Sequence, residues 1–353
     1  MKKIVLTGGG TAGHVTPNIA LIPLLRAQGF EIHYIGTSKG LERDLISREN
    51  IPYHAIAAGK LRRYVDFRNL TDIFRILIGS IQAFFILLKV GPDVVFSKGG
   101  FVSCPVVWAS WLLRIPSVIH ESDMTPGLAN RLSIPFTVKV CYSFPETGGH
   151  IKVGKGVYTG LPVRQSLLSG DPARGRCLCK FKIDSKPVIM VIGGSQGAQA
   201  INKVVRESLD RLLVDFNVCH ICGKGGTDKN GRDGYAQFEY VNQELPDLFA
   251  AADCVISRAG ATTIFEILAL RKPSILIPLP LSASRGDQIL NARSFERNEW
   301  CAVLPQEELT AETLADKVRT TMKERERMIG AMTRSGIQNG ADKVLQVILE
   351  YGK

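Results

Sequence analysis

The sequence predicts an α/β protein with two domains, each built around a parallel sheet. Segments typical of strands alternate along the chain with segments typical of helices, which is the rhythm of βαβ units. A strand, a glycine-rich loop and a helix follow one another near the N-terminus and again at 186–202. The length of 353 residues is sufficient for two domains that each have a hydrophobic core.

The first half opens with an apolar strand, a glycine loop and a helix. The helix has apolar positions at Leu21, Leu24 and Leu25 and ends at Gly29, and another helix begins at about Leu41. The segment 157–164 closes this half. The strands expected in it lie at 2–7, 31–36, 93–100, 117–122 and 139–144.

The second half repeats the pattern and ends in a charged, helix-forming tail from about Ala311. Pro162, Gly170 and Pro172 mark the junction, so we expect domains at 1–162 and 163–353, with the last helix packing back on the first domain. In Rossmann-like sheets, ligands bind at the carboxyl ends of the strands, so we expect the two domains to face each other across a ligand-binding cleft. Strands are expected within 186–193, 216–223, 236–241, 254–260 and 273–280.

The charge and hydropathy of the chain restrict its partners and location. A formal net charge of +11 favours anionic partners, but no zinc-finger, RRM or KH pattern indicates nucleic acid. No signal peptide follows Lys2 and Lys3. The longest apolar run, Ile76 to Leu88, has 13 residues, whereas a spanning helix needs about 20. We therefore expect a cytoplasmic protein whose apolar run contacts a bilayer.

The cysteines do not indicate a metal site. The chain has eight, and in a cytoplasmic protein we expect them to be reduced and buried. The "CHIC" segment, Cys219 to Cys222, has the spacing of half a zinc site, but it lies in a predicted strand, where positions three apart face opposite sides. The sequence also lacks a D-x-D motif, which weakens any case for a metal-bound nucleotide sugar.

The first glycine loop has the G-x-G-x-x-G spacing of a dinucleotide site, at Gly8, Gly10 and Gly13. An NAD site also needs an acidic residue after the second strand, and that strand ends in Ile35-Gly36-Thr37. We therefore favour a loop whose backbone amides approach a different phosphate or sugar. His14 follows the last glycine, and an imidazole suits proton transfer near neutral pH.

Two further segments carry candidate residues. "GGSQG", Gly193 to Gly197, resembles a hydrolase elbow, but only His220 follows Ser195, and it lies in a strand. We interpret Ser195 as part of a second phosphate cradle. "SRAGATTIFEILAL" carries Glu266 on a helix after a strand, where it either faces the ligand or is an ordinary exposed carboxylate.

With these motifs in order, the chain closely resembles the MurG family, the bacterial enzymes that add N-acetylglucosamine to lipid I. The resemblance covers nearly the whole chain. It rests on "GGGTAGHVTPN", "GGFVSCP", "HESDMTPGLANR", "GGSQGAQAIN", "SRAGATTIFE" and "LPLSASRGDQILNA", in family order.

The resemblance implies a GT-B fold and a metal-independent, inverting hexosyl transfer from UDP-N-acetylglucosamine, with no cofactor. It implies that the enzyme works on the cytoplasmic face of the membrane as a peripheral protein, on an anionic surface. By similarity, His14 lies beside the acceptor hydroxyl and Glu266 binds the ribose hydroxyls. The substrate-binding positions implied are Thr11, Ala12, Gly13, Asp123, Arg164, Ser195, Glu266 and Gln288.

The sequence departs from the family at one of these positions and at a position close to another. Asp123 matches a position that is often asparagine, and Leu161 precedes Arg164 where many members have asparagine. Two other functions stay open. One is a GT-B enzyme with a different acceptor, such as diacylglycerol, and the other is a membrane regulator that binds a UDP-sugar without turnover.

Overall fold

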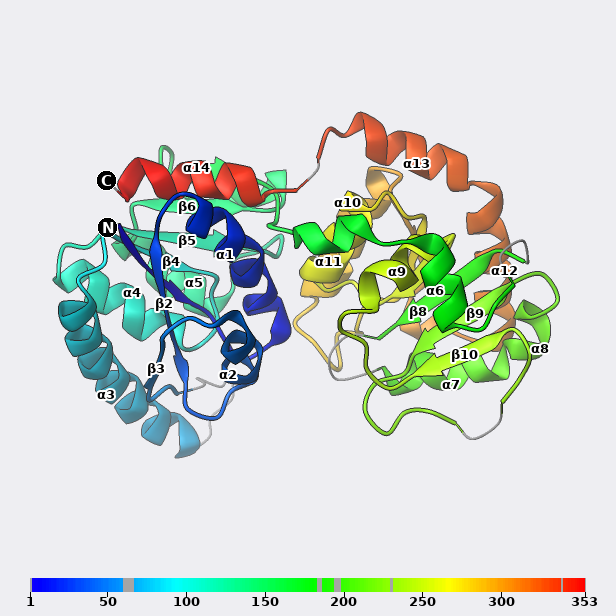
Figure 1. The fold of residues 1–353 in the computed structure, drawn as a ribbon, viewed down its shortest axis with the longest axis horizontal. Coiled ribbons are helices and arrows are strands. Elements are labelled where there is room, and N and C mark those ends of the chain that lie inside the picture. Colours follow the sequence, from blue (N-terminus) through cyan, green and yellow to red (C-terminus); the bar gives the residue numbers. More distant parts are fainter. Residues whose placement is uncertain are drawn as a thin grey trace. The chain divides into compact units, whose positions relative to one another are not determined.

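The computed structural model describes residues 2–59, 67–182, 186–193, 198–228, 231–337 and 339–352, with 67–71 described by their backbone. The chain divides into two compact units, 1–164 with 339–353, and 165–338. Each unit is a parallel sheet between helices, which confirms the predicted α/β class with two Rossmann-like domains (Figure 1).

The first unit contains a seven-stranded parallel sheet in the order β3-β2-β1-β4-β5-β6-β7. Its strands are β1 (Lys3–Thr7), β2 (Glu31–Thr37), β3 (Tyr53–Ile56), β4 (Val94–Ser97), β5 (Ser117–Glu121), β6 (Lys139–Tyr142) and β7 (Gly156–Tyr158). Its helices are α1 (Thr16–Ala27), α2 (Leu41–Ile46), α3 (Phe67–Val90), α4 (Ser103–Leu112), α5 (Leu128–Ser133) and α14 (Ala341–Tyr351). Short 3₁₀ turns are η1 (Ala12–His14), η2 (Ser47–Glu49), η3 (Ile134–Phe136) and η4 (Pro145–His150).

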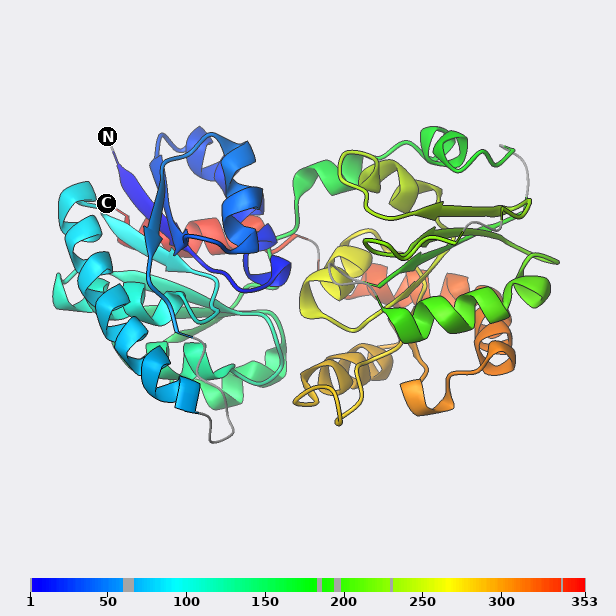
Figure 2. The same cartoon turned by 90° about the horizontal axis from the view of Figure 1, so that it is seen from below.

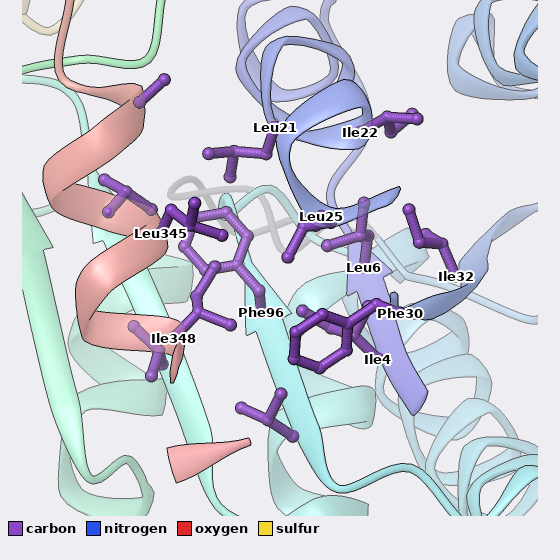
Figure 3. Packing of buried hydrophobic residues seen from close by; sticks show 14 of the residues in the cluster. Ile4, Leu6, Leu21, Ile22, Leu25, Phe30, Ile32, Phe96, Leu345 and Ile348 are labelled. Carbon is purple, nitrogen blue, oxygen red and sulfur yellow. The ribbon is translucent and has the colours of Figure 1, made fainter. Parts of the chain in front are cut away.

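Alternating side chains of the central strands reach two hydrophobic cores, one on each face of this sheet. Ile4 and Leu6 pack with residues of α1 and α14, whereas Val5 packs with residues of α3 and α4. Figures 1 and 2 show these two pairs of helices on the two faces of the sheet. Figure 3 shows Leu345 and Ile348 of α14 packed beside Phe96 of β4. The last helix of the chain therefore completes the core of the first unit.

The second unit contains a six-stranded parallel sheet in the order β10-β9-β8-β11-β12-β13. Its strands are β8 (Val188–Ile192), β9 (Asn217–Ile221), β10 (Tyr235–Phe238), β11 (Cys254–Ser257), β12 (Ser274–Leu276) and β13 (Ala302–Val303). Its helices are α6 (Pro172–Leu178), α7 (Gln199–Glu207), α8 (Leu209–Leu212), α9 (Leu245–Ala251), α10 (Ala261–Ala269), α11 (Asp287–Arg297), α12 (Ala311–Lys323) and α13 (Arg325–Arg334), with 3₁₀ turns η5 (Gln165–Ser169) and η6 (Gln306–Glu308). The core beneath α7, α8 and α12 contains Ile201, Val205, Leu212 and Val318.

Helix α3 is longer than the apolar run of the sequence, because it begins before that run at Phe67 and continues after it to Val90. The helix has 24 residues, and Asp72–Val90 is long and apolar enough to cross a membrane by length and composition alone. Gly79 and Gln82, which interrupt the apolar run, both contact the backbone of Ala57. A Cβ on Gly79 would lie 2.0 Å from the carbonyl oxygen of Ala57, and Gln82 accepts a hydrogen bond from the Ala57 amide at 2.6 Å.

One face of α3 belongs to the core of the first unit. Ala83 and Leu87 are fully buried there against the sheet and α4.

All eight cysteines are free, and seven are buried as expected, whereas Cys177 is exposed because it lies on the outer side of α6. Among the described residues, no group of three His, Cys, Asp or Glu side chains could hold a metal ion.

Candidate functional site

Three loops leave the carboxyl edge of the first sheet from neighbouring central strands. Strand β1 pairs with β4 through Thr7 and Ser97, and β4 pairs with β5 through Ser97 and Ile119. The loops that follow these strands begin at Gly8, Lys98 and Ser122. The parallel register therefore gathers the three motifs at one edge, where sheets of this kind bind their ligands.

The first two loops pack backbone against backbone. A Cβ on Gly100 would lie 2.2 Å from the carbonyl oxygen of Gly9, and one on Gly10 would lie 2.6 Å from the Phe101 ring. Both Gly10 and Gly100 have φ of +88°, a left-handed conformation that glycine adopts without strain. The glycines thus hold the two loops in contact, which no larger residue would allow.

His14 lies at the end of the first loop, in the turn η1. Its Nδ1 lies 3.1 Å from the carbonyl oxygen of Gly9 and 3.3 Å from Oγ1 of Thr11. A carbonyl oxygen can only accept, so the neutral ring carries its proton on Nδ1 and its lone pair on Nε2. The ring is half-buried, as are Ala12 and Gly13, whereas Thr11 is exposed. This arrangement suits Nε2 to accept a proton.

Glu121 organises the third loop. Its buried carboxylate accepts hydrogen bonds from the backbone amides of Asp123 and Gly127, each at 3.0 Å, and from the Asn130 side chain at 2.8 Å. Burial raises the pKa of Glu121, and the charge of Asp123 raises it further. These bonds fix the backbone of half-buried Asp123 at the same edge as His14.

Lys98 is a buried cation beneath these loops that sequence reasoning missed. Its Nζ donates to the hydroxyl of Ser122, and its side chain is 1% exposed. Burial lowers the pKa of Lys98 to about 8, against the opposing effect of the Glu121 and Asp123 carboxylates. The signal in the sequence was a lysine directly before the glycine pair of "SKGG", next to "HESD".

Arg164 ends the first unit, at a point where the chain is tied to its returning segment. The amide of Val163 donates to Oδ1 of Asn339 at 2.8 Å, and the amide of Gly340 donates to the carbonyl of Leu161 at 3.0 Å. The Leu161 side chain is fully buried. The leucine at the position where many family members have asparagine is therefore buried, and its backbone carbonyl pairs with the returning segment.

The second unit holds the other predicted residues, and two of them follow adjacent strands. Glu266 on α10 follows β11 and is 6% exposed, so the alternative of an ordinary exposed carboxylate is wrong. Gln288 on α11 follows β12, and its Oε1 accepts from the Leu279 amide at 3.1 Å. Ser195 lies outside the described residues.

Arg258 links the loops that follow β11 and β12. Its guanidinium donates to the carbonyls of Ile277 and Pro278, at 3.1 and 3.3 Å, and to Oε1 of Gln306 at 2.6 Å. Burial lowers its pKa. Sequence reasoning missed this role, although the arginine of "SRAG" directly follows a strand.

The structure therefore divides the predicted residues that it describes between the two units. Thr11, Ala12, Gly13, His14 and Asp123 belong to the first unit, as does Arg164, and Glu266 and Gln288 belong to the second. A pocket of about 460 Å³ borders Gly10 in the first unit and is lined also by Lys39, Glu42, Arg75 and Phe101.

Family comparisons match both units. The family described as "Glycosyltransferase family 28 N-terminal domain" matches residues 4–142, and "Glycosyltransferase family 28 C-terminal domain" matches residues 188–348. The chain is 52% identical over 352 residues to a Clostridium tetani protein, covering 99% of this chain and 98% of the relative. It is 53% identical over 355 residues to a Clostridium botulinum protein, covering all of both chains. Both relatives are named UDP-N-acetylglucosamine–N-acetylmuramyl-(pentapeptide) pyrophosphoryl-undecaprenol N-acetylglucosamine transferase.

Solved structures agree with the family match. The crystal structure of Acinetobacter baumannii MurG is 25% identical with a TM-score of 0.75, covering 99% of this chain and all of that one. The glycosyltransferase of kitacinnamycin is 14% identical with a TM-score of 0.72, covering 100% of this chain and 99% of that one, a likeness of fold alone.

Proposed function

We propose that the chain, which belongs to glycosyltransferase family 28, transfers N-acetylglucosamine from UDP-N-acetylglucosamine to the 4-hydroxyl of the muramyl sugar of lipid I. The products are lipid II and UDP. The observation that carries this proposal is identity of about half, over the full length, with transferases named for that reaction. The two Rossmann-like units agree with a GT-B glycosyltransferase.

In this proposal His14 is the general base. Inverting transfer needs a group that removes the proton of the acceptor hydroxyl as that oxygen attacks the sugar. The hydrogen bond from Nδ1 of His14 to Gly9 orients the ring and leaves the lone pair on Nε2. Thr11, Ala12 and Gly13 lie in the same turn or directly before it, where their backbone contacts the donor sugar and pyrophosphate.

The second unit binds the donor nucleotide in this proposal. Buried Glu266 accepts hydrogen bonds from the ribose hydroxyls, and Gln288, Ser195 and Arg164 contact the rest of UDP-N-acetylglucosamine. Asp123 contacts the donor from the first unit. The positive charge of Arg164 and the amides of the glycine loops stabilise negative charge that grows on departing UDP. The mechanism uses neither a metal ion nor an organic cofactor.

We assign the membrane contact to the outer face of α3. Ile81 and Phe85 are 60% and 63% exposed, although the opposite face of the helix is buried in the core. Monomeric soluble proteins rarely expose so continuous an apolar stripe, and lipid I is confined to the bilayer. The exposed apolar residues of this face are Ile73, Phe74, Leu77, Ile78, Ile81, Phe85 and Leu88.

The core packing of α3 favours a helix that lies on the membrane over one that spans it. Ala83 and Leu87 would have to leave the first unit for the helix to cross a bilayer. We also assign to the contact the basic residues of the preceding loop, Arg62 and Arg63, which lie outside the described residues, and Arg68, whose side chain is likewise not described. Basic groups near anionic lipids contribute about 1 kcal/mol each to binding.

The test is incubation with UDP-N-acetylglucosamine and lipid I, with diacylglycerol offered in a parallel reaction. Formation of lipid II and UDP supports the proposal. Transfer to diacylglycerol alone would identify a different acceptor, and donor binding without turnover would identify a regulator; each result would contradict it.

A further inference from the structure

The structure assigns a role in the proposed reaction site of the first unit to the carboxylate of Glu42. We infer that Glu42 is a positioning residue that acts on His14 through the peptide group between Gly9 and Gly10. This inference rests on the proposed role of His14 as base. It concerns a residue about thirty positions along the chain from the glycine loop, at the start of α2.

Glu42 is a fully buried carboxylate held by hydrogen-bond donors. Its Oε1 accepts from the Thr37 amide at 3.1 Å and from the Thr37 hydroxyl at 2.5 Å, and its Oε2 accepts from the Gly10 amide at 3.3 Å. Burying a carboxylate is costly unless such bonds satisfy it. One of these three donors, the Gly10 amide, belongs to the loop that carries the proposed base. The hydrogen bonds that satisfy the buried carboxylate therefore also hold that loop in place.

The contact between Glu42 and the loop is close enough to exclude other residues. A Cβ on Gly9 would lie 2.7 Å from Oε1 of Glu42, and a Cβ on Gly40 would lie 2.2 Å from the same atom. On the opposite side, Gly100 approaches the carbonyl oxygen of Gly9. The peptide between Gly9 and Gly10 therefore lies between the second glycine loop and a carboxylate.

This one peptide group joins Glu42 to His14. Its N–H donates to the carboxylate, and its carbonyl oxygen accepts from Nδ1–H of His14 at 3.1 Å. A negative charge on the N–H side polarises the peptide and makes its oxygen a stronger acceptor, because hydrogen bonds in a chain strengthen one another. A stronger acceptor at Nδ1–H stabilises the imidazolium that forms when Nε2 takes a proton. A buried aspartate bonded directly to the histidine has this function in serine proteases.

The arrangement also fixes the ring itself. With the Gly9 carbonyl held in place, the Nδ1-protonated form of His14 is favoured, and Nε2 points its lone pair in one direction. Glu42 does not contact the substrate in this account. Its effect on catalysis is transmitted by the orientation and basicity of His14, which distinguishes it from a residue that only supports the fold.

The first experiment compares Glu42→Gln with Asp93→Asn. Glutamine keeps the volume and an acceptor oxygen but removes the charge. Asp93 is the matched control, because it accepts from the Lys3 amide at 2.6 Å at the opposite end of the same sheet. We expect Glu42→Gln to lower kcat about tenfold and to leave KM for UDP-N-acetylglucosamine unchanged. The acidic limb of the kcat profile should move to lower pH, since His14 becomes less basic, whereas Asp93→Asn should change neither.

The second experiment needs no substrate, and its first part needs no Glu42 variant. In an NMR titration of the wild-type protein, the Gly10 amide resonance should shift with the same midpoint as the His14 ring, and this step should vanish in His14→Gln. In folded Glu42→Gln the His14 midpoint should fall by about half a pH unit or more. The inference would be overturned if the Gly10 amide resonance did not shift as His14 titrates, or if Glu42→Gln left the His14 midpoint unchanged.

These readouts separate the inference from the proposed function. If His14→Ala keeps normal turnover while the Gly10 amide follows His14, the coupling is real and the assignment of the base is wrong. If His14→Ala is inactive and the Gly10 amide is insensitive, the base stands and the role of Glu42 is refuted.

Discussion

The imidazole of His14 hydrogen-bonds through Nδ1 to the backbone carbonyl of Gly9, at 3.1 Å. The partner is part of the main chain, so the ring's orientation depends on the conformation of the glycine loop. This loop is packed against the second glycine loop through Gly100. Both glycine motifs therefore hold in place the histidine that we propose as the base.

Replacing His14 should affect chemistry more than binding. We predict that His14→Ala lowers kcat by about a hundredfold or more, because general-base catalysis contributes roughly 10² to 10⁴ in rate. Donor affinity, measured by calorimetry with UDP, should change little. His150→Ala is the control, since His150 is an exposed histidine of the same unit. Near-normal turnover of His14→Ala would remove it as the base.

Replacing Glu266 should have the opposite effect. Glu266→Gln keeps the volume of this buried side chain and should weaken UDP binding by about 1–3 kcal/mol if the carboxylate accepts buried ribose hydroxyls. The exposed Glu312 on α12 provides the control as Glu312→Gln. A dissociation constant for UDP that is the same in Glu266→Gln and wild type would refute this assignment.

Turnover should continue in excess EDTA. The sequence lacks the D-x-D motif that binds a metal-bound nucleotide sugar in other transferases. The prediction is checked by measuring UDP release after dialysis against chelator, with and without added magnesium or manganese. Activity that is lost in chelator and restored by either ion would contradict a metal-independent mechanism.

The outer face of α3 should account for membrane binding. We predict that Ile81→Ser with Phe85→Ser strongly reduces sedimentation with anionic vesicles, while turnover of a water-soluble acceptor analogue stays near normal. Val153→Ser with Val214→Ser is the matched control, because both valines are highly exposed elsewhere. Changing Arg62, Arg63 and Arg68 to glutamate should also weaken binding, mainly at low salt. This docking face would be excluded if the Ile81→Ser, Phe85→Ser variant and the arginine-to-glutamate variant both sedimented with vesicles as the wild type does.

Stability of the second unit should fall in acid because of His220. Its Nδ1 lies 2.9 Å from the Tyr235 hydroxyl and its Nε2 lies 2.9 Å from Oδ1 of Asn202, so the neutral ring is satisfied. Burial, together with the charge of Arg206, lowers the pKa of His220 to about 3. An unfolded histidine titrates near 6.5, so between pH 6.5 and 3 the unfolded chain binds the extra proton.

The stabilising contribution of neutral His220 is therefore present above pH 6.5 and is lost as the pH falls toward 3. The loss is about 1 kcal/mol per pH unit. His220→Gln should lose less stability than wild type between pH 6.5 and 4 in urea unfolding, whereas exposed His150→Gln should behave as wild type. Parallel stability curves for His220→Gln and wild type would show that the ring is not buried in its neutral form.

Local patterns in the sequence predicted most of the fold. The strand–loop–helix order identified the central strands of both sheets, since buried parallel strands are continuous apolar runs. The edge strands β3, β7 and β13 were missed. They have four, three and two residues, and only one residue of β3 is buried, so none of them gives a pattern. The apolar run did not give the length of α3, because the helix begins at Phe67 and its first turns contain polar residues such as Asp72 and Arg75.

A candidate site could be proposed from the sequence where a motif carries its own chemistry. His14 was proposed because a histidine follows a glycine loop, and Glu266 because an acid follows a strand and a turn. Glu42 and Lys98 were not found. Each acts through tertiary contacts, Glu42 with Gly10 and Lys98 with Ser122, across separations that sequence spacing does not reveal.

The most direct measurement of the central claim is product formation from lipid I in the presence of UDP-N-acetylglucosamine labelled in the sugar. The account predicts that label appears in lipid II with one UDP released for each sugar transferred, and that His14→Ala forms little product under the same conditions. Label that stays in the donor, or that passes to diacylglycerol but not to lipid I, would contradict it.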